Sequence, residues 1–147
     1  MTKIVDKELN IELQVKAIEL LNSSIKLPAN PNKPITNFNF NIEIESSFDA
    51  PNKLFFVIVH VEVKDDDQFI LGALSVSCIF EIANFSDVVK VQADGKIDMP
   101  SKLIETLNFI SISTTRGVMF STFRGTFLHG AFLPIIDPKQ FQLGIQK

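Results

Sequence analysis

Residues 38–48, FNFNIEIESSF, alternate apolar and polar side chains more clearly than any other stretch of the chain. Large apolar side chains occupy the even positions from 38 to 44 and position 48, while the odd positions carry Asn, Glu or Ser. A period of two residues is that of a β-strand, so this stretch predicts a strand with one buried and one hydrated face. The next run, residues 54–64, is β-branched and aromatic on both faces, which is typical of a central strand.

Two further strands extend this pattern in both directions. Residues 69–82 follow the short acidic turn Asp65-Asp66-Asp67 and are expected to pair back on residues 54–64 as a hairpin, which completes a three-stranded meander. Residues 11–27 begin with strict alternation that slips in phase at Ala17-Ile18, which favours a long bent or bulged strand. A helix over residues 8–21 is the alternative.

A proline-rich connection separates the first strand from the meander. Residues 28–34, PANPNKP, contain three prolines in seven residues and predict an exposed crossover. Residues 84–98 are mixed and polar, with Asp94-Gly95 as a turn, and predict a loop that contains a short irregular piece.

From Pro100 the apolar period changes to three or four residues, which predicts a long helix over residues 100–124 that ends before Gly125. The expected seam consists of Leu103, Leu107, Ile110, Thr114 and Val118. Strong helix formers are scarce after residue 108, so packing must stabilise the helix. Other apolar residues lie off the seam, which indicates burial on more than one side, by a second layer or another subunit. They are Phe109, Met119, Phe120 and Phe123.

The fold class predicted from these segments is α+β. A four-stranded antiparallel sheet (about residues 11–82), with a crossover between the first and second strands, precedes a helical part (about residues 100–147) of one long and one short helix. The extended stretch 128–141 contains Pro134 and Pro138 and leaves room for only a short terminal helix. A length of 147 residues suggests a single domain, residues 1–147, large enough for a real core.

Composition narrows the class of protein. Hydrophobic residues make up 46% of the chain, which argues against disorder, but no apolar run approaches the length of a membrane span or signal peptide. We therefore expect a soluble, cytoplasmic protein, and the single cysteine, Cys78, agrees with a reducing compartment. All 14 aromatic residues are phenylalanine and the net charge is −3, so nucleic acid is a poor partner.

Catalytic and metal-binding patterns are weak throughout the sequence. His60 and His129 have no nucleophile or carboxylate at triad or ligand spacing, and Cys78 lies on the apolar phase of its strand, so structural roles are expected. Asp65-Asp66-Asp67 lacks the ligand spacing of a calcium loop and is interpreted as a solvated turn. The sequence predicts no enzyme activity, no metal and no cofactor.

The remaining feature is the phenylalanine-rich stretch 109–132. Its five phenylalanines cannot all point inward from one helix and its tail, and exposed apolar area on this scale marks an interface or a binding groove. These residues are Phe109, Phe120, Phe123, Phe127 and Phe132.

Two motifs resemble the SecB chaperone family. Residues 78–83, CIFEIA, are similar to the end of that family's fourth strand, and Arg124-Gly125-Thr126-Phe127 matches its Arg-Gly-Thr-Phe after the long helix. Pro134-Ile135 falls at the spacing of its Pro-Val, and Phe141 matches an aromatic residue that begins its terminal helix. The similarity covers roughly residues 11–141.

The resemblance implies an ATP-independent holdase that binds unfolded or preprotein segments in protein export. It also implies a homotetramer, a dimer of dimers, without membrane insertion. Phenylalanine suits such binding because it offers apolar area without sequence-specific hydrogen bonds. The peptide-binding groove expected from the resemblance contains Phe38, Phe40, Phe120, Phe127, Phe132, Leu133 and Phe141.

The sequence departs from export SecB proteins where acidic side chains form the docking patch for the translocase motor SecA. The corresponding residues are Asn22, Lys26, Leu71 and Ala73, so the required charges are missing or reversed. SecA docking is therefore doubtful. A chaperone dedicated to an antitoxin or another specific partner is one alternative, and a structural oligomeric or small-ligand module is another.

Overall fold

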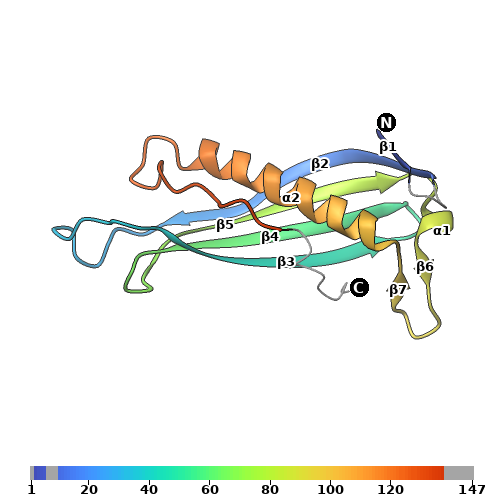
Figure 1. The fold of residues 1–147 in the computed structure, drawn as a ribbon, viewed down its shortest axis with the longest axis horizontal. Helices are drawn as coiled ribbons and strands as arrows, with labels where there is room; N and C mark the ends of the chain where they lie inside the picture. Colours follow the sequence, from blue (N-terminus) through green and yellow to red (C-terminus); the bar gives the residue numbers. More distant parts are fainter. Residues whose placement is uncertain (1, 6–9, 138–147) are drawn as a thin grey trace.

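A twisted antiparallel sheet with one long helix on a face forms the body of the computed structural model, which describes residues 2–5 and 10–137 (Figure 1). The strand order β1-β2-β5-β4-β3 confirms the meander and the crossover between the first two predicted strands. The short β1, which pairs antiparallel with the start of β2, was not predicted. The strands are β1 (Thr2–Val5), β2 (Asn10–Ile25), β3 (Asn39–Asp49), β4 (Leu54–Lys64) and β5 (Ile70–Ile82).

Strand β2 is bulged, as the slip in its sequence pattern predicted, and the alternative of a helix over residues 8–21 is wrong. Its register with β5 shifts between Val15 and Ala17 and again between Leu20 and Asn22. Each extra residue changes the face to which the following side chains point. The shifts therefore keep Val15, Ile18 and Leu20 on one face of the sheet, opposite the buried residues of β5.

The segment after β5 contains more regular structure than the predicted loop. A single helical turn, α1 (Phe85–Val88), precedes a small hairpin of β6 (Lys90–Val91) and β7 (Ile97–Asp98). Gly95 turns the hairpin at φ 82°, in agreement with the predicted Asp94-Gly95 turn. Elements of two to four residues are too short to give a periodic signal in the sequence.

The long helix α2 (Ser101–Thr122) agrees with the predicted range, but its buried face is only partly the predicted seam. Leu103 and Leu107 are buried as expected, whereas Ile110, Thr114 and Val118 are half-buried. The helix turns a face with small hydroxyl groups toward β4 and β5. The buried residues of α2 are Leu103, Leu107, Asn108, Ser111, Ile112, Thr115 and Met119.

The buried hydroxyl groups of α2 are satisfied inside the helix. Ser111 Oγ donates to the carbonyl of Leu107 at 2.7 Å, and Thr115 Oγ1 donates to that of Ser111 at 2.7 Å. Their small size lets the helix approach the sheet closely. Cys78 of β5 lies beneath this face at 1% exposure, and burial raises the pKa of its thiol, partly offset by hydrogen bonds from Ser111 and Thr114. Cys78 is thus a core residue.

After α2 the chain turns back over the sheet. Gly125 adopts φ 80°, as a helix stop does, and Leu128 is completely buried against the sheet. The terminal helix expected after residue 137 lies outside the described residues. No helix in the described part of the chain is long and apolar enough to span a bilayer.

Gly72 of β5 is the point where this returning loop meets the sheet. A Cβ atom at this position would lie 2.5 Å from Leu128 Cδ1 and 3.2 Å from the carbonyl oxygen of Ser24. The side chain of Leu128 could rotate, but the backbone of β2 is fixed by its pairing with β5. The absence of a side chain at Gly72 therefore allows residues 123–133 to lie on this end of the sheet.

We predict that Gly72→Ala lowers the free energy of unfolding by about 1–3 kcal/mol, because the added methyl group overpacks the contact with Leu128. Urea denaturation followed by circular dichroism measures the change, since the chain has no Trp or Tyr for intrinsic fluorescence. Gly117→Ala is the matched control. Gly117 lies in α2 with open space around its Cβ position, so alanine there should stabilise by about 0.5–1 kcal/mol. Equal stability of Gly72→Ala and the wild type would contradict the close contact.

Candidate functional site

The helix-bearing face of the sheet is apolar across its width, but α2 contacts mainly β4 and β5. On β2 the first residues of this face, Ile11 and Leu13, are buried, but four apolar residues further along stay 41–50% exposed, although their partners on β5 are buried. We call these four residues the β2 strip; they are Val15, Ile18, Leu20 and Ile25. The chain therefore leaves an apolar flank of its own sheet in contact with solvent.

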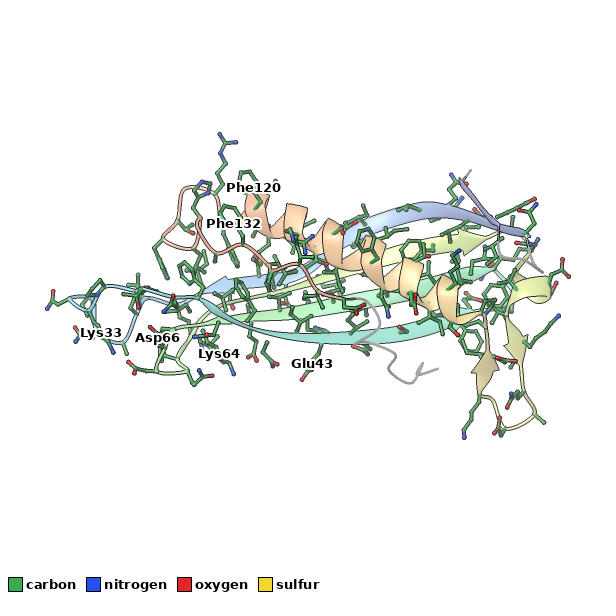
Figure 2. The ribbon with its side chains drawn as sticks, in the orientation of Figure 1. Lys33, Glu43, Lys64, Asp66, Phe120 and Phe132 are labelled. Atoms are coloured by element: carbon green, nitrogen blue, oxygen red, sulfur yellow. The ribbon has the colours of Figure 1, made fainter. Side chains whose placement is uncertain are left out.

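A second apolar area, the phenylalanine surface, consists of the exposed rings of Phe120, Phe127 and Phe132. Phe120, from the last turn of α2, stacks on Phe132 with ring centroids 6.3 Å apart and an interplanar angle of 18° (Figure 2). The imidazole of His129 also contacts Phe120, with the two ring centroids 5.4 Å apart. The three phenylalanines are 37–58% exposed, whereas Phe123 beside them is 1% exposed. One of the four rings thus anchors the loop and three face solvent.

Arg116 of α2 holds the chain that carries Phe132. Its Nε donates to the carbonyl of Leu133 and its Nη2 to that of Pro134, both at 2.8 Å. The planar guanidinium is suited to this two-pronged contact with consecutive carbonyl groups. Leu133 itself is buried at 2% exposure. Arg116 and Leu133 together fix the extended stretch against the helix, with Phe132 facing outward.

The crossover between β2 and β3 is fastened to the β4–β5 hairpin at the same end of the sheet (Figure 2). Lys33 Nζ lies 2.8 Å from Asp67, Thr36 Oγ1 donates to Asp66 at 2.9 Å, and Asn39 Nδ2 donates to the carbonyl of Asp65 at 3.1 Å. The contact with Asp67 raises the pKa of the Lys33 ammonium above its ordinary value. The acidic turn is therefore more than a solvated turn, because all three aspartates hold the crossover.

The other residues of the expected groove lie in different environments. Phe38 and Phe40 are half-buried and pack against the core at the start of β3, on the same face of the sheet as α2. Phe141 lies outside the described residues. Of the residues that correspond to the SecA patch, Asn22 and Lys26 are exposed and Ala73 is half-buried, while Leu71 is 0% exposed and has no surface to offer a partner.

The opposite, open face of the sheet holds a hydrogen-bonded chain that the sequence did not reveal. His60 of β4 has Nδ1 2.7 Å from Ser75 Oγ on β5 and Nε2 3.0 Å from Glu45 on β3. These residues are 15 positions apart in sequence, and only the strand register could have brought them together. The two hydrogen bonds therefore link three strands. Because Ser75 is only 6% exposed, its hydroxyl group has little access to a substrate.

No other constellation with recognisable chemistry occurs in the described ranges. Within residues 2–5 and 10–137, no group of three His, Cys, Asp or Glu residues is arranged to hold a metal ion. The buried polar side-chain atoms of these residues all have hydrogen-bond partners. The most distinctive features of this chain are therefore its two exposed apolar areas, which are suited to binding rather than to chemistry.

Comparison with known proteins places this geometry in a known fold. The sequence matches no family model and no curated protein. Among solved structures it is similar to a SecB-like chaperone of Mycobacterium tuberculosis in complex with a ChAD peptide from the HigA1 antitoxin. The two structures align with a TM-score of 0.54 and 15% sequence identity, and the alignment covers 84% of this chain and 89% of that chain. The chain has the SecB-like fold. The resemblance indicated by the Arg124–Phe127 motif is confirmed at that level.

A second solved structure, a protein of unknown function from Streptococcus agalactiae, aligns with a TM-score of 0.35 at 10% identity over 77% of this chain and 88% of that chain. That score is too low to bear on the fold. Within the SecB-like fold, residues 78–82 end β5, Ala83 follows directly, and Arg124–Phe127 follows α2. Both motifs therefore stand at the ends of the elements where the resemblance put them.

We predict that Arg116→Ala releases the stretch that carries Phe132 and lowers the free energy of unfolding by about 1–2 kcal/mol, because two backbone carbonyl groups lose a charged donor. Hydrogen exchange measured by mass spectrometry should show faster exchange in residues 131–137. Arg116→Lys should rescue only part of the effect, since an ammonium lacks the planar fork. Arg124→Ala is the control, as Arg124 is exposed. Unchanged exchange in Arg116→Ala would show that Leu133 alone fixes the stretch.

Proposed function

We propose that this protein is an ATP-independent chaperone, a holdase that binds non-native polypeptide segments on its phenylalanine surface. The observation that supports the proposal is the exposure of Phe120 at the end of α2 and of Phe127 and Phe132 on the segment that follows, which Arg116, Gly72 and Leu128 hold in place. A rigid support means that little conformational entropy is lost when a client covers the rings.

The chemistry of this surface favours broad recognition. Full burial of a phenylalanine side chain is worth about 1.5–3 kcal/mol, so covering several half-exposed rings can give useful affinity without any hydrogen bond to the client. Apolar area of this kind selects exposed hydrophobic segments rather than a particular sequence. Phe38 and Phe40 at the start of β3 complete the client site that we propose. Leu133 is buried and supports this site from beneath, and Phe141 is assigned to it from the resemblance.

We further propose that the β2 strip is covered by a second copy of the chain. Beyond its pairing with β1 at residues 10–13, β2 has β5 as its one neighbour among the described strands, so its outer edge also offers unpaired backbone groups. A second β2 could pair along this edge and bury both strips. A dimer of dimers, implied by the family resemblance, would cover the exposed side of α2 as well.

A chaperone dedicated to one partner is the second candidate. The similar structure from Mycobacterium tuberculosis is a complex with an antitoxin peptide, which supports a polypeptide partner of that kind. The charges expected at a SecA docking patch are absent at Asn22, Lys26 and Ala73, and Leu71 is buried, which favours a role outside SecA-dependent export. Selective capture of one antitoxin-like protein, with no general suppression of aggregation, would favour this candidate over a general holdase.

We expect Phe120→Ala/Phe132→Ala to weaken binding of an unfolded client by about tenfold or more, since each ring offers a large exposed apolar contact. Calorimetric titration with a reduced, carboxymethylated polypeptide and a light-scattering assay of aggregation measure the effect. Phe109→Ala is the matched control, because Phe109 is 56% exposed on α2 but lies outside the proposed client site. A wild-type protein that neither binds the client nor suppresses aggregation would refute the holdase.

We expect Ile18→Lys/Leu20→Lys to shift the protein to a smaller assembly, because both positions face the apolar flank and a buried ammonium in a dimer would be costly. Multi-angle light scattering after size exclusion gives the mass. Glu19→Lys, on the same strand but the opposite face, should leave the mass unchanged. If the wild type is a monomer at micromolar concentration, the strip is not a self-association surface.

A further inference from the structure

A cavity at the end of the sheet away from the phenylalanine surface combines an apolar floor with a cationic rim. It has a volume of about 300 Å³ and lies between the β3–β4 turn, α1 and β6; its lining residues are Ala50, Lys53, Phe85, Ser86, Val89, Lys90 and Val91. This volume is at the lower limit of sites that hold small ligands or single large side chains. Strand β4 separates this cavity from the phenylalanine surface by roughly 30 Å.

The floor of the cavity is rigid. Phe85 and Val89 are 4% and 3% exposed and belong to the core, and the ring of Phe85 lies 6.3 Å from that of Phe48. Val91, on the wall, is 51% exposed. A large apolar group that entered here would therefore meet preformed apolar surface on two sides.

The rim carries two lysines whose charges are not neutralised by a carboxylate. Lys90 Nζ donates to the carbonyl of Ser86 at 2.8 Å, which leaves two of its three donors for another acceptor. Lys53 forms no ion pair within the described residues, and its backbone is held at φ 61° in the turn. The residues that line the cavity therefore carry two positive charges and no negative one, in a chain whose net charge is −3.

The nearby carboxylates Asp49, Asp87 and Asp98 form no ion pair with either lysine among the described residues. Asp49 accepts hydrogen bonds from the backbone N–H and the Nδ2 of Asn52, and Asp98, although opposite Lys90 in the β6–β7 register, forms no ion pair with it. A ligand that brings its own carboxylates would supply the missing negative charge.

We infer that this cavity binds an extended polypeptide segment in which a large apolar side chain is flanked by acidic ones. Strand β6 favours a polypeptide over a small amphipathic acid, because β7 is its one strand neighbour in the described sheets and its other edge is free to pair with an added strand. In an extended segment, residues two apart share a face. An apolar residue can therefore enter the cavity while acidic residues on either side of it reach Lys53 and Lys90.

Fluorescence anisotropy with a labelled peptide, Ser-Glu-Ser-Phe-Ser-Glu-Ser, tests the inference on the full chain. The peptide should bind about fivefold to tenfold more tightly than the version with Gln in place of both Glu, and the difference should shrink with added salt. Replacement of its Phe by Ala should also weaken binding. Equal affinity of the acidic and the Gln peptides would overturn the inference.

Variants of the protein locate the binding. Lys53→Asn/Lys90→Gln should lose the preference for the acidic peptide, and Asn tolerates the positive φ at position 53. Lys64→Gln/Lys102→Gln removes the same charge away from the cavity and should retain the preference. The melting temperatures of both double variants should match that of the wild type. Unchanged selectivity in Lys53→Asn/Lys90→Gln, or binding of decanoate there without binding of the peptide, would refute the assignment.

Discussion

The helix α2 is narrower than the sheet that it covers, and most of the surface properties of this protein follow from that mismatch. An α-helix with its side chains is about 10–12 Å across, while neighbouring strands lie about 4.8 Å apart. One helix can therefore shield about two strands, and α2 contacts β4 and β5. The sheet has four long strands with apolar residues on this face, so both flanks extend beyond the helix (Figure 1). The flank on β3 is half-buried, and the flank on β2 is open.

The same mismatch connects the architecture to binding. Exposed apolar surface of this extent marks a contact with another molecule, which can be a second copy of the chain or a bound ligand. The two apolar areas differ in construction, since the β2 strip belongs to a long bulged strand, whereas the phenylalanine surface spans the end of α2 and a loop fixed by Arg116 and Leu128. A strand edge suits a permanent symmetric contact, and a supported cluster of rings suits exchangeable ligands.

The cavity between α1 and the β3–β4 turn differs from both exposed apolar areas in its charge. Its floor is apolar, like the two exposed apolar areas, and the charges of Lys53 and Lys90 on its lining distinguish it from the phenylalanine surface. Apolar contact supplies affinity with little selectivity, and unpaired charges at a rim supply selectivity with modest affinity. A polypeptide that meets both ends of the sheet would be held in one orientation.

The sequence by itself determined the strands, because alternation in residues 38–48 and the bulge near Ala17 are properties of local periodicity. It also determined that phenylalanines of the helix and tail exceed what the core can hold.

Only the tertiary structure decided which of them are exposed: Phe123 is buried and Phe120 is not, although both were expected off the seam. Packing against the sheet sets that choice, because Phe123 lies beside Gly72 of β5, a residue far away in sequence. The same reason explains why the sequence could not reveal the Ser75–His60–Glu45 chain, the anchoring of the crossover by Asp65–Asp67, or the lysine-rimmed cavity. Each unites residues from separate elements, and strand register and loop packing bring them together.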